Sequence, residues 1–455
     1  MKSKGFVLPI SLIVLAVLIA GGAAFLFYSG NDGNREDAVH QELSSAATKA
    51  PATDVVVVES HSSASSPISM PTPLPDSGLA PVSPPQTKPP TQPVNTGYSY
   101  STQRPGWEIL TEKEKAQLPA CGNVLMTIPP VPLSSITSIE PIGSANPPEH
   151  TLASISSDTY IAVQGQGTTA TTPLVAPGDM WIIFIQPRYG VTQDPEDHVI
   201  KYAFCKDVYG VVDHVKSFSP ELQKLVDTYQ CTYGGTPGDN ECPIILLEPV
   251  TAGTPLGTVG RIQGNFNFGT WDLRVMHNFV NPSRHGLLTK HSTCPFDYFA
   301  APQKSELMAK LDGPSCGNVE HDVAGTLAGD WFIGDASPTR HADWGKLLHF
   351  GTSNRFANQS VISASGVFVS QPTKWIFPAS LAGTVNRIFK DVTANGTMYC
   401  YDNDGNHPYK NNEKGIERGK ILVQLTSNSE LKVEHQEGEC QGGEWAFENP
   451  TAYIR

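Results

Sequence analysis

The 455-residue sequence predicts a mostly β protein that follows a membrane helix and a disordered tether. Phe6–Tyr28 is a continuous apolar run, residues 31–105 are rich in Pro, Ser and Thr, and apolar residues alternate with polar ones in many short runs from residue 106 onward. We therefore divide the chain into an anchor (1–30), a linker (31–105), a first β domain (106–278) and a second, antiparallel β domain (279–455).

The apolar run is long enough to cross a bilayer. At about 1.5 Å per residue, a helix over Phe6–Tyr28 spans the hydrocarbon core of about 30 Å. Lys2 and Lys4 precede the run, and positive charge is retained on the cytoplasmic side. This pattern predicts a single-pass protein of the cell membrane, anchored through residues 6–28, with an extracytoplasmic C-terminal ectodomain.

Two other interpretations of the N-terminus stay open. The small residues Ala20–Ala24 offer a place for signal-peptide cleavage. Lys4-Gly5-Phe6 resembles a type IV prepilin leader, which would be cut after Gly5 and would make the chain a pilin-like structural subunit. Ile10 stands where a pilin has its glutamate.

The linker is predicted to be disordered. Its composition, from about Asn31 to Arg104, does not bury enough apolar surface to offset the entropy of ordering, and its prolines favour polyproline II. We expect a tether that holds the ectodomain away from the membrane.

Charge and cysteine content limit the function further. The formal net charge of −13 disfavours nucleic acid, whose phosphates require clustered Lys and Arg. Eight cysteines in an exported chain predict disulfides. Cys231 and Cys242 bracket a turn-rich loop whose ends meet readily, so we pair them with each other.

The first β domain opens with a short helix. Thr111 and Glu114 have the spacing of a capping box. A second helix is predicted over Ser219–Tyr229. Strands are predicted over Tyr160–Val163, Met180–Ile185, His198–Phe204, Ile244–Leu247 and Gly257–Phe268.

The second β domain is predicted to be an antiparallel meander that closes into a small barrel or sandwich. A helix is expected over Pro302–Leu311. His285 and His291, near Cys294, are potential metal ligands that no periodicity brings together. Strands are expected over Gly325–Ile333, Gly345–Gly351, Ser360–Ser370, Thr384–Phe389, Gly396–Tyr401, Ile421–Thr426, Glu430–His435 and Glu444–Phe447.

A run of glycines leads into two asparagines that suggest a family. The segment Val-Thr-Ala-Gly-Thr-Pro-Leu-Gly-Thr-Val-Gly (250–260), followed by Asn265-Phe-Asn267, resembles the lysostaphin-type (LytM-like) zinc endopeptidases. In that family a similar hairpin leads into a strand with His-x-His, so Asn265 and Asn267 stand in place of a catalytic and a zinc-ligating histidine. The alternative is that the glycines of this segment are ordinary turn residues, such as occur in the hairpins of any β-rich domain.

Three upstream segments extend the resemblance in the same order. Residues 172–185 resemble the family's TPVxAPxDGxV segment. His150 and Asp158 resemble its first pair of zinc ligands, and His214 lies in a stretch that resembles the YxHLS segment, whose histidine acts on the transition state. The resemblance covers about residues 140–272 and implies a lysostaphin-like β barrel of the duplicated-hybrid type.

The two asparagines argue against a working zinc site. Catalytic zinc needs about three protein ligands and an open position for water, and an amide is a poor ligand compared with an imidazole. We therefore expect no bound cofactor and a non-catalytic, peptidase-like domain that binds peptidoglycan or an envelope protein. The alternative is an active zinc endopeptidase with an unusual ligand set, such as His150, Asp158 and His214.

Overall fold

The computed structural model describes residues 106–145, 156–164, 170–187, 197–229, 243–262, 264–337, 341–364, 366–367, 369, 373–402, 419–441 and 443–455. The predicted anchor, the linker, His150 and the Cys231–Cys242 pair lie outside these residues. No helix in the described part of the chain is long and apolar enough to span a membrane.

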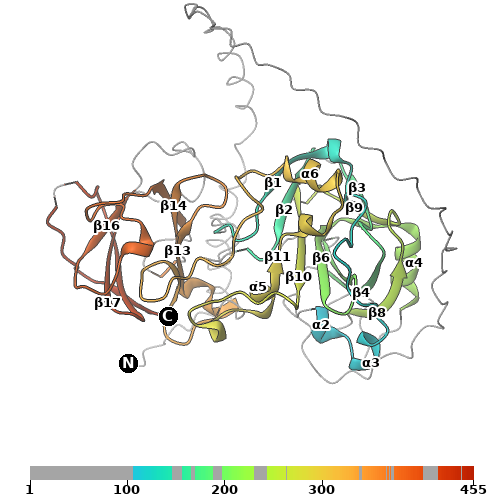
Figure 1. Cartoon of the computed structure of the whole chain (residues 1–455), viewed down its shortest axis with the longest axis horizontal. Helices are drawn as coiled ribbons and strands as arrows, with labels where there is room; N and C mark the ends of the chain where they lie inside the picture. Colours follow the sequence, from blue (N-terminus) through green and yellow to red (C-terminus); the bar gives the residue numbers. More distant parts are fainter. Residues whose placement is uncertain are drawn as a thin grey trace, which may run out of the picture. The chain divides into compact units, whose positions relative to one another are not determined.

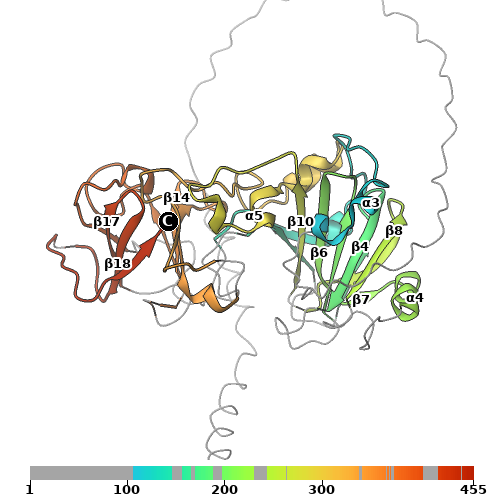
Figure 2. The same cartoon turned by 90° about the horizontal axis from the view of Figure 1, so that it is seen from below.

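An eight-stranded antiparallel sheet forms the centre of the first β domain (Figures 1 and 2). Its strand order is β1-β2-β10-β6-β5-β4-β8, and β11 also pairs with β10. The strands are β1 (Ile136–Glu140), β2 (Thr159–Val163), β10 (Asn265–Asp272), β6 (Val208–Val215), β5 (His198–Ala203), β4 (Met180–Pro187), β8 (Ile244–Val250) and β11 (Ser292–Thr293).

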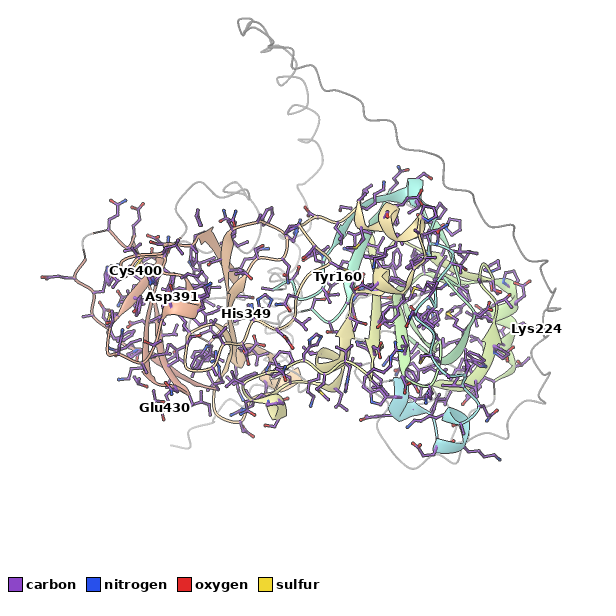
Figure 3. All side chains as sticks on the ribbon, in the orientation of Figure 1. Tyr160, Lys224, His349, Asp391, Cys400 and Glu430 are labelled. Carbon is purple, nitrogen blue, oxygen red and sulfur yellow. A yellow bond between two sulfur atoms is a disulfide. The ribbon has the colours of Figure 1, made fainter. Side chains whose placement is uncertain are left out.

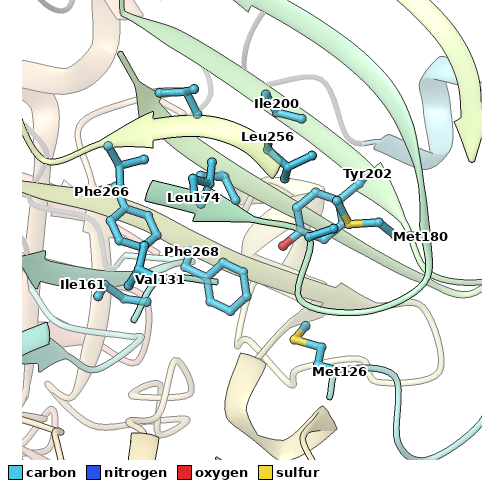
Figure 4. Packing of buried hydrophobic residues seen from close by; sticks show 14 of the residues in the cluster. Met126, Val131, Ile161, Leu174, Met180, Ile200, Tyr202, Leu256, Phe266 and Phe268 are labelled. Carbon is cyan, nitrogen blue, oxygen red and sulfur yellow. The ribbon is translucent and has the colours of Figure 1, made fainter. Parts of the chain in front are cut away.

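A small sheet covers one face of the large one. It has the order β3-β9-β7, with β3 (Thr172–Val175), β9 (Pro255–Val259) and β7 (Ser217–Phe218). Alternate residues of β10, Phe266 and Phe268, pack here with Leu174 and Leu256 (Figure 4). This two-sheet core is what the period-two pattern of the strands produces.

The opposite face of the large sheet is apolar only at one end. Trp107, from helix α2 (Gly106–Ile109), packs edge-on against Tyr209 and Trp271. Helix α3 (Glu112–Lys115) follows, and its Thr111–Glu114 capping box confirms that prediction. The other end of this face is polar and contains the candidate site.

The second β domain is an eight-stranded, nearly closed antiparallel barrel with the order β15-β14-β13-β12-β19-β18-β17-β16. Isolated pairings of Ser380 with Arg387 and of Val385 with Cys400 link the end of β15 to β16 through the segment between them. The strands are β12 (Gly329–Phe332), β13 (Leu347–Thr352), β14 (Gln359–Ala364), β15 (Thr373–Pro378), β16 (Tyr399–Asp402), β17 (Lys420–Ser427), β18 (Glu430–Gln436) and β19 (Thr451–Ile454).

Three predicted strands differ from the structure. The run Gly257–Phe268 is two strands, β9 and β10, separated by a turn. Residues 384–389 form no strand and only bridge the two edges of the barrel. Residues 444–447 form none either, because Trp445 and Phe447 pack near the Cys400–Cys440 disulfide while Ala446 accepts a hydrogen bond from a side chain.

The remaining elements are short helices. Helix α4 (Pro220–Thr228) begins at the N-cap Ser219 and buries Leu222 and Val226, and helix α6 (Gln303–Met308) lies within the predicted helix Pro302–Leu311. Helix α5 is Leu287–His291, and the 3₁₀ turns are Leu133–Ser135, Pro282–Arg284, Pro295–Tyr298, His341–Lys346 and Phe389–Asp391.

Candidate functional site

The polar end of the large sheet follows from strand alternation. On β10, Phe266 and Phe268 point into the two-sheet core, so Asn265, Asn267 and Gly269 lie on the opposite face with Trp271. Asn267 pairs with Tyr160 of β2 on one side. On its other side, the register between β10 and β6 places Asp213 next to it. Lys201 of β5 lies on the same face, opposite Val211, and is buried.

Asp158 and Asn267 contact each other on this face. The Asn267 amide nitrogen donates to the Asp158 carboxylate over 3.4 Å, and the Ser157 hydroxyl donates to the same carboxylate over 3.3 Å. Gly269 makes the approach possible, because a Cβ there would collide with Oδ1 of Asp158. The Asn267 carbonyl oxygen Oδ1 is buried and has no hydrogen-bond partner among the described residues.

The charge of Asp158 also affects the pKa of Tyr202, which is buried in the core. Burial raises the pKa of Tyr202 well above its usual value, and the negative charge of Asp158 raises it further. The Tyr202 phenol therefore stays protonated and available only as a neutral donor or acceptor.

His214 lies in a buried ionisable cluster with Asp197 and Asp213. Its Nδ1 is 3.0 and 3.2 Å from the two carboxylate oxygens of Asp197, and its backbone NH donates to Asp213 over 2.9 Å. Its φ of 63° is unusual for a residue other than glycine. Among the described residues, these three form the one group of His, Cys, Asp or Glu side chains that are close enough together to hold a metal ion. Their ligand atoms all lie within 4.8 Å of one another.

The residues near Asp158 do not fit the zinc site that the resemblance implies. Asp158 and Asn267 meet as a hydrogen-bonded pair and offer only oxygen and amide groups, while zinc prefers imidazole or thiolate donors. Asn265, on the same face, is partly exposed and offers another amide. No catalytic step through zinc can be built from these described side chains.

Two members of this site carry no clear signal in the sequence. Asp197 follows a segment without periodicity, and the family resemblance points to His214 rather than to its neighbour Asp213. The alternation along β6 and β10 places Asp213 beside Asn267, but only once the register of these strands is known.

Six of the eight cysteines lie in the described residues, and all six are paired. The disulfides are Cys121–Cys205, Cys294–Cys316 and Cys400–Cys440. The prediction of disulfide bonding is therefore confirmed for these cysteines.

Comparisons with known proteins give only distant structural similarity. No protein-family profile matches the chain, and no curated protein matches it. Two crystal structures of Helicobacter pylori Csd3 match 39% and 43% of the chain at 12% and 15% identity, each with a TM-score of 0.24. The chain spans 34% and 42% of the Csd3 chain in those two structures.

The solution structure of lysostaphin is also similar. It matches 49% of this chain and 80% of its own, at 9% identity and a TM-score of 0.19. Scores this low carry no argument about family or activity, so the lysostaphin-type resemblance continues to rest on the sequence motifs.

Proposed function

We propose that this chain is a membrane-anchored, extracytoplasmic envelope protein whose first β domain binds cell-wall peptide or an envelope protein without cleaving it. The observation that supports the proposal is the hydrogen bond between Asn267 and Asp158. It occupies the position where the family resemblance expects two zinc ligands.

The chemistry of this pair suits recognition better than hydrolysis. Peptide hydrolysis by this family requires zinc to polarise the scissile carbonyl and to lower the pKa of bound water. An amide holds no such metal tightly, but it donates and accepts hydrogen bonds like a peptide backbone. The buried, unpartnered Oδ1 of Asn267 supplies an acceptor that a ligand's NH group satisfies.

Restoration of both histidines tests the proposal. In the Asn265→His/Asn267→His double variant, zinc affinity should rise at least tenfold over the parent protein, because the imidazole at position 267 then joins Asp158 as a ligand. The matched control is Asn428→His, in the exposed turn between β17 and β18. Binding of isolated peptidoglycan by the parent protein, measured by co-sedimentation, tests the ligand half of the proposal.

Two results oppose the proposal separately. If the double variant and the control bind zinc equally, Asp158 and the two positions do not form one metal site. If the parent protein neither sediments with peptidoglycan nor captures an envelope protein, the first β domain does not bind as proposed.

A zinc-dependent hydrolase is the second candidate function. The observation that favours it is the cluster of Asp197, Asp213 and His214, which has two carboxylates and one imidazole within metal-binding distance of one another. Asp197→Asn should then abolish any zinc-dependent activity. An unchanged zinc content in that variant would remove this candidate.

A further inference from the structure

The sequence contains a single Asn-Gly pair, at Asn395 and Gly396. The pair lies in a turn of the C-terminal barrel, between Asp391 and Cys400 of β16 (both labelled in Figure 3), and both of its residues are exposed. An asparagine side chain can react with the backbone nitrogen of the next residue. Glycine has no Cβ to shield that nitrogen, so this pair is a candidate for the reaction.

The backbone nitrogen of Gly396 is accessible. Its NH group has no hydrogen-bond acceptor among the described residues, and nothing beyond its chain neighbours lies within 4 Å of the point where a Cβ would be. Its φ of 78° lies in the region that favours glycine. The carbonyl oxygen of Gly396 accepts a hydrogen bond of 2.7 Å from Nε2 of Gln424. The residue is therefore held at its oxygen, while its nitrogen is left open to solvent.

The Asn395 side chain is folded back over the following peptide. Its Oδ1 accepts a hydrogen bond of 2.9 Å from the backbone NH of Thr397, and its own backbone NH donates to the carbonyl oxygen of Thr393 over 2.8 Å. The bond to Thr397 closes a ring of atoms that contains both Cγ of Asn395 and the nitrogen of Gly396. The two atoms that have to join are therefore kept near each other.

The same hydrogen bond favours the reaction electronically. When a nitrogen adds to Cγ of Asn395, the oxygen Oδ1 gains negative charge. The Thr397 NH already points at this oxygen. A donor aimed in advance at a developing oxyanion lowers the barrier to addition.

A second exposed turn of the same barrel lacks these features. Asn428 lies between β17 and β18, but Ser429 follows it instead of glycine. The Ser429 NH donates to the Ser427 hydroxyl over 3.3 Å. The nitrogen after Asn428 is therefore shielded by a side chain and already engaged, so Asn428 serves as an internal reference for Asn395.

We propose that Asn395 is a self-modification site, at which the side-chain amide is deamidated without an enzyme. The Gly396 nitrogen gives its proton to solvent base and bonds to Cγ of Asn395. The Cγ–Nδ2 bond breaks, Nδ2 takes up a proton and leaves as ammonia, and a cyclic imide remains. Water then adds to either imide carbonyl, which yields aspartate or isoaspartate at position 395. Nothing is oxidised or reduced.

The two products differ in their effect on the turn. Aspartate leaves the main chain unchanged and still accepts from the Thr397 NH. Isoaspartate passes the main chain through the former side chain, which inserts a methylene group and displaces the Gly396 carbonyl from Gln424. Both products add a negative charge to the barrel surface. The modification is independent of the function proposed for the first β domain.

Peptide mapping by mass spectrometry of the full-length protein, aged at 37 °C and pH 8.5, tests the proposal. We expect Asn395 to convert at least about tenfold faster than Asn428 in the same sample, because only Asn395 has an open glycine nitrogen and an aimed oxyanion donor. The rate should rise about tenfold per pH unit, since the attacking nitrogen must first lose its proton. Both isoaspartate and aspartate should form, because the imide opens at either carbonyl.

Two comparisons make the result specific to this turn. Asn395→Gln places the amide one methylene group farther from the Gly396 nitrogen, so its peptide should stay unmodified over the same period. A synthetic peptide of residues 391–401 sets the rate for the same pair outside the fold. Native protein that is unconverted when the synthetic peptide is half converted would overturn the proposal. Equal rates at Asn395 and Asn428, or aspartate without isoaspartate, would also overturn it.

Discussion

Asn267 differs from a zinc-ligating histidine in how strongly it binds metal, and zinc-dependent catalysis requires a strong ligand. Its amide is neutral and binds metal weakly, whereas an imidazole offers a strong nitrogen donor. The contact between Asn267 and Asp158 uses this amide as a hydrogen-bond donor. At the scale of single residues, the first β domain is arranged for hydrogen bonding.

Gly269 should be sensitive to the addition of a single methyl group. In Gly269→Ala the new Cβ would collide with Asp158 and lie 3.0 Å from Cγ1 of Val211, so we expect a loss of about 1–3 kcal/mol in the free energy of unfolding. Gly345→Ala is the control, because nothing lies within 4 Å of its Cβ. Urea denaturation measures both, and equal stabilities would contradict the packing described for Asp158.

His321 should make the protein less stable in mild acid. Burial, and then the neighbouring His349, lower the pKa of His321 from 6.5 to about 4. Between these pH values the unfolded chain binds a proton that the folded protein does not, so stability falls as the pH drops from 6.5 to 4. The shift corresponds to at most about 3 kcal/mol.

Urea denaturation of metal-free protein at pH 7.5 and 4.5 measures this effect. His321→Gln should lose less stability on acidification than the parent protein. Asp322, Asp330, His285 and His349 surround His321 in the parent protein and are unchanged in the variant, so the difference between the proteins reports His321. An identical loss in the two proteins would show that His321 is not the sensitive group.

At the scale of elements, the end of the barrel depends on Arg455. Its guanidinium lies 4.3 Å from the Trp331 ring and donates to the carbonyl oxygens of Val323, Thr326 and Ala328. Trp331 in turn donates its indole NH to Leu327. These contacts connect the residue after β19 to the turn before β12, where the two strands share only one paired position.

Arg455→Lys should therefore destabilise the barrel. A lysine keeps the charge but loses the planar fork that serves several carbonyls, so we expect a loss of about 2–4 kcal/mol. Arg261→Lys, at an exposed position, is the matched control. Thermal denaturation of the two variants compares them, and a similar melting temperature would contradict this role for Arg455.

Local sequence patterns predicted many of the helices and strands. The Thr111–Glu114 box, helix α4 and strands β2, β4 and β5 follow from side chains close together in sequence. Strands β1, β6, β7, β11, β15 and β19 were not predicted. Their place depends on a partner strand rather than on a strong alternation of their own, and every residue of β6 is buried.

The two buried polar clusters show the same limit. Asp158 and Asn267 were found because a family resemblance joined positions 109 residues apart. His321, Asp330 and His349 have no motif in the sequence, since they meet only through the pairing of β12 with β13 and a loop that covers both strands. Neither periodicity nor spacing contains that information.

At the scale of the whole molecule, the cysteines test the predicted compartment. Six are paired in the structure, and Cys231 and Cys242 are the remaining two. In an exported protein we expect all eight to be oxidised, with a Cys231–Cys242 peptide pair found by mapping without reduction. Free thiols at these two positions in native protein would contradict the pairing.

The topology prediction concerns the anchor. Residues 31–455 should be digested by protease added outside intact spheroplasts, while the mature chain should retain residues 6–28. N-terminal sequencing distinguishes the alternatives, because a chain that begins at Phe6 supports the pilin interpretation and one that begins near Ala24 supports a cleaved signal. Full protection from protease would contradict an extracytoplasmic ectodomain.

The central claim is that the first β domain binds without cutting, and release of soluble muropeptides from purified peptidoglycan tests it most directly. The full-length protein should be assayed with added zinc, with a chelator, and as the Asn265→His/Asn267→His variant. We predict that the unmodified protein releases no muropeptides at any zinc concentration, because Asn267 leaves Asp158 without an imidazole at the third-ligand position. Zinc-dependent, chelator-sensitive release by the unmodified protein would contradict the claim.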